Sequence, residues 1–79
     1  MKLHVLVLDG VFDTGLSAVL DVFATANELA ASFARDVAPF EVGVVGMRRR
    51  VRTAHGFTVP LGGTIGSGPE DWVVIPALA

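Results

Sequence analysis

Residues 3–10 read LHVLVLDG, and this stretch decides the fold. It is a nearly unbroken run of aliphatic side chains that ends at Asp9 and Gly10, two residues typical of turns. A strand buried on both faces has such a continuous apolar sequence, whereas a strand with one face in water alternates apolar and polar side chains. The stretch therefore predicts a central strand in a parallel sheet.

The periodicity changes after residue 15. Apolar side chains then recur at steps of three and four residues, the spacing of one face of an amphipathic helix. They are Leu16, Val19, Leu20, Phe23, Ala26, Ala30 and Phe33. Residues 36–39 end this helix, because the residue before a proline is disfavoured in the helical conformation. Residues 40–45 predict a second strand, which a right-handed crossover places parallel to the first.

Three further segments complete the predicted order. Residues 50–53 and 57–61 predict a short hairpin or two short strands that are not central, with Pro60 marking an edge. The glycine-rich residues 62–69 predict a loop, and residues 71–76 predict a third strand of the sheet. Trp72 and the helix phenylalanines occupy apolar positions and are expected in the core. The order predicts an α/β fold with a mainly parallel sheet.

The composition limits the class of protein. The chain has 79 residues, no cysteine and a formal net charge of −2. It is thus one small domain at most, without disulfides or thiolate chemistry and without an electrostatic reason to bind nucleic acid itself. Its apolar runs of five or six residues are far shorter than the roughly 20 that cross a bilayer. We therefore expect a cytoplasmic protein with no membrane association.

The predicted sheet lacks cover on one side. Parallel sheets are normally covered on both faces, and one helix covers only one. Residues 1–79 are therefore expected to be the amino-terminal half of one larger α/β domain, truncated at its carboxyl end. The alternative is a complete small protein that covers its open face by forming an oligomer.

Ligands of open α/β sheets bind beyond the carboxyl ends of the strands. In this sequence those ends hold six candidate ligand-binding residues: Asp9, Gly10, Asp13, Gly15, Pro76 and Ala77. The carboxylates of Asp9 and Asp13 can hold a polar ligand group. The alternative, which we favour for these two residues, is that both cap turns and bond their own backbone.

Residues 48–52 hold four of the six basic residues of the chain. Arginines can pair with a phosphate, an acidic ligand or a carboxylate of a neighbouring domain. The alternative, which we favour, is a solvated turn and edge strand kept from pairing by charge. His4 and His55 have no second ligand at metal spacing, so structural roles and no metal site are expected. Phosphate-loop and dinucleotide-binding motifs are absent from the sequence, and no cofactor is expected.

The order of the motifs resembles a known family. Residues 5–11 read VLVLDGV, and the following helix carries the pattern Asp21, Val22, Phe23, Ala26 and Asn27. With residues 51–56 and 71–76, these motifs resemble the amino-terminal part of the ThiJ/PfpI-like (class I glutamine amidotransferase-like) domain, in the version fused to AraC-family transcriptional regulators. The resemblance implies a flavodoxin-like three-layer α/β sandwich, often dimeric, of which residues 1–79 are the first half.

The enzymes of that family use a glutamate just after the first strand and a cysteine on a later strand-to-helix turn. Gly15 stands at or near the glutamate position, with Asp13 the nearest acid, and the cysteine would lie beyond Ala79. Ala77 stands where relatives usually have glycine. No catalytic residue is therefore carried over to this chain.

The resemblance leads to two hypotheses about function. The leading one is a non-catalytic ligand-sensing and dimerisation segment of an AraC-type regulator: a homodimer with a small-molecule effector, which binds DNA only through a carboxyl-terminal helix-turn-helix region outside this chain. The alternative is a fragment of a ThiJ/PfpI-like cysteine hydrolase, amidase or glyoxalase whose nucleophile lies beyond Ala79. A free-standing oligomer with a structural role is a third possibility.

Overall fold

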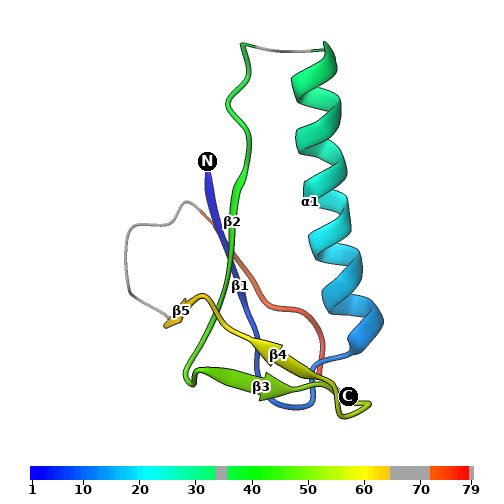
Figure 1. The fold of residues 1–79 in the computed structure, drawn as a ribbon, viewed down its shortest axis with the longest axis vertical. Coiled ribbons are helices and arrows are strands. Elements are labelled where there is room, and N and C mark those ends of the chain that lie inside the picture. Colours follow the sequence, from blue (N-terminus) through cyan, green and yellow to red (C-terminus); the bar gives the residue numbers. More distant parts are fainter. Residues whose placement is uncertain (34–35, 65–71, 79) are drawn as a thin grey trace.

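The computed structural model describes residues 1–33, 36–64 and 72–78. Its elements follow one another along the chain as Figure 1 shows. They are β1 (Lys2–Leu6), α1 (Asp13–Phe33), β2 (Glu41–Gly46), β3 (Arg50–Arg52), β4 (Thr58–Pro60), β5 (Gly63–Thr64) and β6 (Trp72–Val74). The predicted first strand, helix, second strand, hairpin and returning strand are all confirmed.

The main sheet has the strand order β5-β2-β1-β6, and every pairing in it is parallel. β1 lies between β2 and β6, with Val5 opposite Val44 on one side and Val74 on the other. This position confirms the central parallel strand and the α/β class. β3 and β4 form a separate antiparallel hairpin, in which Val51 faces Val59.

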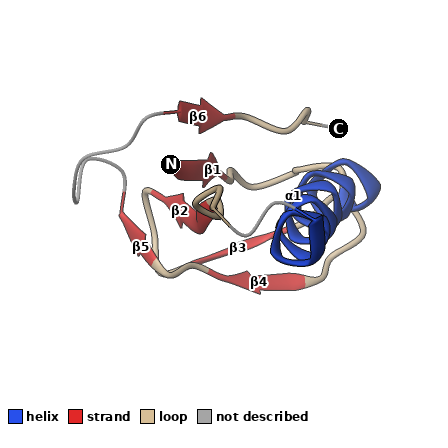
Figure 2. Cartoon of the chain, turned by 90° about the horizontal axis from the view of Figure 1, so that it is seen from above, coloured by secondary structure: helices blue, strands red, loops and turns tan. Residues whose placement is uncertain are grey.

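The core lies between one face of the sheet and α1. Alternate residues of β1 and the following turn, Leu3, Val5 and Val7, are buried and pack with Leu16 of the helix. Figure 2 shows α1 on one side of the sheet and the hairpin beside the edge of β2. The opposite face of the sheet carries no helix in the part of the chain that the structure describes.

A side chain of the helix fixes where β2 begins. The amide nitrogen Nδ2 of Asn27 donates a hydrogen bond to the Phe40 carbonyl at 2.9 Å, and its oxygen Oδ1 accepts one from the Phe40 N–H at 2.8 Å. The ring of Phe23 meets that of Phe40 edge to face, with centroids 5.0 Å apart. Asn27 thus satisfies both backbone groups of a residue that precedes the sheet.

The structure differs from the expectations at three places. The helix begins at Asp13, before the first periodic apolar residue, and Gly63–Thr64 of the predicted loop pair with β2 as β5. Trp72 and Phe33 are 61% and 85% exposed, so the expectation that they are core residues is wrong. Burial of an apolar side chain requires a covering layer, and no described element supplies one over these two.

Among the described residues, α1 is long and apolar enough to meet the length and composition criterion of a membrane-spanning helix. A core helix of a soluble protein and a signal sequence near the N-terminus meet the same criterion, so this helix is weak evidence of a membrane span. In this structure Leu16, Val19, Leu20 and Phe23 of α1 belong to the core or pack against it.

Two glycines of β2 allow a matched test of this packing. A Cβ on Gly46 would lie 2.9 Å from the Val7 carbonyl oxygen and 2.5 Å from Leu61 Cδ1, whereas one on Gly43 would meet only the His4 ring, at 3.5 Å. We expect Gly46→Ala to lower the free energy of unfolding by about 1–3 kcal/mol, because backbone must shift. Gly43→Ala should change it by no more than about 0.5 kcal/mol. Urea denaturation measures both, and equal losses would contradict the close approach at Gly46.

Candidate functional site

The turn after β1 is joined to the hairpin by backbone hydrogen bonds. Gly10 has a φ of +87°, a conformation that residues with a side chain rarely adopt, and its N–H donates to the Arg52 carbonyl at 2.9 Å. The Ala54 N–H donates to the Val11 carbonyl at 2.8 Å. Val11 is fully buried and also forms an antiparallel bridge to Leu78. Three distant segments of chain therefore meet at Val11.

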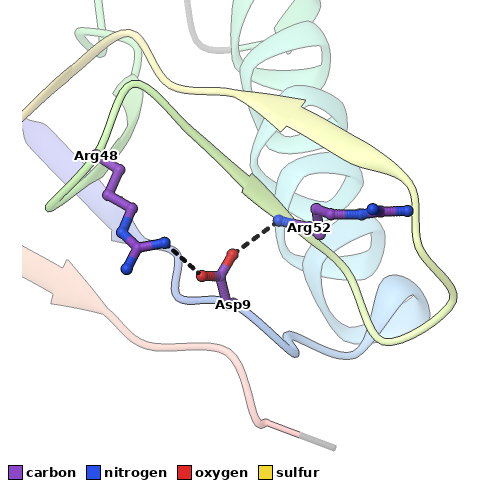
Figure 3. Close-up of polar contacts among 3 residues, drawn as sticks. All are labelled: Asp9, Arg48 and Arg52. Atoms are coloured by element: carbon purple, nitrogen blue, oxygen red, sulfur yellow. Dashed lines mark hydrogen bonds and ion pairs between the residues drawn. The ribbon is translucent and has the colours of Figure 1, made fainter.

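Asp9 adds its carboxylate to this junction, as Figure 3 shows. Its Oδ1 accepts a hydrogen bond from the backbone N–H of Arg52 at 2.9 Å, and its Oδ2 accepts one from Arg48 Nη1 at 3.3 Å. The side chains of Arg48 and Asp9 are 75% and 53% exposed. An exposed ion pair of this kind contributes about 0–1 kcal/mol to the free energy of unfolding. The shorter hydrogen bond, from the Arg52 backbone N–H, is therefore the contact that we expect to join Asp9 to the hairpin.

Asp13, in the first turn of α1, makes the second carboxylate contact. It accepts hydrogen bonds from the Thr53 hydroxyl at 2.5 Å and from the His55 N–H at 3.1 Å. The hydrogen bond from Thr53 is the largest cause that holds the pKa of Asp13 below its ordinary value, against the opposing effect of desolvation. Thr53 is buried, and its hydroxyl also accepts from the Phe57 N–H at 3.0 Å.

The Asp13 carboxylate bonds its own backbone N–H, as expected, and both Asp9 and Asp13 also reach the hairpin, which the sequence does not predict. Their partners in and next to the hairpin lie 39 to 43 residues further along the chain. Sequence reasoning missed them because no local pattern indicates which hairpin residue a turn carboxylate reaches. A role for either residue in ligand binding stays a prediction, and both carboxylates already have protein partners.

The other candidate residues lie along the same edge. Gly15 is in the first turns of α1, and Pro76 is buried after β6. Ala77 is exposed, and its carbonyl accepts a hydrogen bond from the Phe12 N–H at 2.9 Å. The segments that follow β1 and β6 therefore meet, as expected for parallel strands.

A cavity of about 640 Å³ opens between the turn after β1 and the hairpin. Its lining residues are Asp9, Gly10, Arg48, Arg50, Val51, Arg52, Thr53 and Thr58. Of the six candidates it includes Asp9 and Gly10, whereas Asp13, Gly15, Pro76 and Ala77 lie outside this lining. Arg48, Arg50 and Arg52 are exposed, as expected for a solvated turn and edge strand, and a role for them in binding stays a prediction.

No group of three or more histidine, aspartate or glutamate side chains suited to a metal ion occurs among the described residues. Gly15 has no side chain to act as an acid or base. Asp13, the nearest acid, is bonded to Thr53 and His55.

Comparison with solved structures identifies proteins of similar architecture. The chain superposes on an AraC family transcriptional regulator from Pseudomonas putida with a TM-score of 0.79 at 17% sequence identity, covering 99% of this chain and 47% of that one. A DJ-1 superfamily protein from Agrobacterium tumefaciens superposes with a TM-score of 0.64 at 16% identity, covering 99% of this chain and 38% of that one. The chain shares their fold. It spans less than half the length of either.

No protein-family model matches the sequence, and no curated protein matches it. The two structural relatives are those that the motif resemblance predicts: a protein of the DJ-1/ThiJ superfamily and a regulator of the AraC family. At these identities the similarity establishes the flavodoxin-like α/β fold.

The Thr53 contact predicts a pH dependence of the hairpin. Because the pKa of Asp13 lies below its ordinary value of 3.8, the contact stabilises the folded chain above that pH and is lost as the pH falls through the lowered pKa. Thr53→Val should raise the pKa of Asp13, as followed by NMR titration of the carboxyl carbon. Thr53→Ser, which keeps the hydroxyl, and Thr58→Val, on β4, serve as controls. An unchanged Asp13 pKa in Thr53→Val would contradict this assignment.

Proposed function

We propose that residues 1–79 form the amino-terminal part of the ligand-sensing and dimerisation domain of an AraC-type transcriptional regulator. The observation that carries the proposal is the superposition of almost the whole chain on the regulator from P. putida, with a higher TM-score than on the DJ-1 superfamily protein. The motif of Asp21, Val22, Phe23, Ala26 and Asn27 supports the same assignment.

The remainder of the domain supplies the missing layer in this proposal. Val73 and Ile75 are 41% and 61% exposed, and an apolar strand face normally packs against helices in a parallel sheet. The chain spans 47% of the regulator, which leaves length for a second half of the domain and for a DNA-binding region. DNA contact then belongs to a helix-turn-helix region, whose recognition helix enters the major groove.

Effector binding is assigned to the carboxyl edge of the sheet, from Asp9 to Gly15 and at Pro76 and Ala77. Open α/β sheets bind ligands at this edge. The protein acts as a cytoplasmic homodimer that responds to a small molecule. It is not an enzyme, because Gly15 replaces the glutamate that tunes the cysteine nucleophile in the enzymatic relatives.

A second candidate is a ThiJ/PfpI-like hydrolase, amidase or glyoxalase of which this chain is the first half. The superposition on the DJ-1 superfamily protein favours it. This candidate requires a cysteine after Ala79 and an acid other than Gly15 to activate it.

The coding DNA beyond the codon for Ala79 separates the two functions. We expect the reading frame to continue through the second half of an α/β domain into two helix-turn-helix motifs. A frame that stops shortly after a cysteine on a strand-to-helix turn would contradict the regulator and support the enzyme. A stop at Ala79 would contradict both and support the free-standing oligomer.

A further inference from the structure

Two cavities meet at the arginines of the turn before β3. The cavity described above shares Arg48 and Arg50 with a second one of about 630 Å³, which Arg49 and Pro60 also line. The first cavity is lined by three arginines, Arg48, Arg50 and Arg52, and by one acidic residue, Asp9. Its formal charge is therefore positive, although the whole chain is acidic.

We propose that this cavity binds a small oxyanion, the phosphate or carboxylate group of a small molecule, through Arg48 and Arg50. The site lies between the turn after β1 and the hairpin, at the edge where open α/β sheets hold ligands. The planar guanidinium fork matches carboxylate and phosphate oxygens in pairs. The inference does not depend on the proposed regulatory function, because it concerns binding alone.

Arg48 and Arg50 both have N–H groups available to donate to a ligand. Arg48 gives a single N–H to Asp9, at 3.3 Å, and a guanidinium has five. Within residues 1–33, 36–64 and 72–78, the side chain of Arg50 makes no hydrogen bond or ion pair, while its backbone pairs with Pro60 in the hairpin. Thr58 adds a hydroxyl to the lining. Positive groups that line one cavity repel one another, so a bound anion relieves repulsion and gains hydrogen bonds.

The remaining polar groups of the lining are already engaged. The guanidinium of Arg52 runs along the hairpin, away from Asp9, and its Nη2 donates to the Gly56 carbonyl at 3.2 Å (Figure 3). The Thr53 hydroxyl donates to Asp13, and the Gly10 N–H donates to the Arg52 carbonyl. These bonds shape the cavity wall, and Arg48 and Arg50 are left to hold the anion.

Asp9 acts as an internal counter-ion in this site. Its Oδ2 accepts one hydrogen bond from Arg48, and this contact is exposed to solvent. Its Oδ1 accepts a hydrogen bond from the Arg52 backbone N–H. An incoming anion competes only for the first of these contacts. Asp9→Asn keeps a side-chain oxygen for the Arg52 N–H and removes the competing charge, so it should tighten anion binding.

The test is calorimetric titration of the full-length protein with inorganic phosphate and, separately, with malonate, at constant ionic strength and pH 7.5. We expect one saturable site for at least one of the two anions. Arg50→Ala should weaken binding at least fivefold. Arg49→Ala removes the same charge next to Arg50 but lies outside the first cavity, so it should change the affinity less than twofold. Asp9→Asn should tighten binding at least threefold.

Three results would overturn the proposal. They are no saturable binding of either anion, an equal loss in Arg49→Ala and Arg50→Ala, and unchanged or weaker binding in Asp9→Asn. Equal losses would mean that the anions sense only the overall positive charge of the turn. The gain expected for Asp9→Asn keeps the test valid if Arg50→Ala misfolds, because misfolding does not tighten binding.

Discussion

The turn after β1 holds the two sheets of this structure together. Its backbone exchanges hydrogen bonds with Arg52 and Ala54 of the hairpin, and the carboxylates of Asp9 and Asp13 accept N–H and O–H groups from the same segment. Closing a loop of about forty residues costs conformational entropy. Several hydrogen bonds and the buried side chains of Val11 and Val51 offset this cost together. These contacts keep the hairpin beside the carboxyl ends of the sheet strands, where its residues line the cavity of about 640 Å³.

The main sheet is covered on one face only in the part of the chain that the structure describes. β1 is central, paired on both sides and covered by α1, whereas no described element covers the other face. Trp72 lies on an edge strand, and its exposure follows from the same lack of cover. The chain superposes on 47% of the regulator and on 38% of the DJ-1 superfamily protein.

Most of the fold could be predicted from the sequence, and less of the site. The aliphatic run of β1 and the period of α1 depend on local patterns, so both were predicted correctly. β5 was missed because two residues, Gly63 and Thr64, carry no periodicity. The burial of Trp72 was wrongly predicted because an apolar side chain does not reveal whether a covering layer is present.

The hydrogen-bond partners of Asp9 and Asp13 could not be predicted from the sequence. Asp9 and Asp13 were recognised as the acids of the first loop, but their partners depend on how the hairpin docks, which is a tertiary property. The same docking brings Arg48 and Arg50 beside the loop and turns a basic cluster in the sequence into the wall of a cavity. The candidate site is thus created by packing between distant segments.

Amide hydrogen exchange of Gly10, Arg52 and Ala54 tests the docking of the hairpin most directly. Their N–H groups cross between the turn and the hairpin. If the hairpin is docked, these three amides exchange at least about 100-fold more slowly than in an unstructured peptide, and at similar rates to one another, because they open as one unit. Exchange at unprotected rates, while the Val7 amide bonded to the Val45 carbonyl stays protected, would contradict the account.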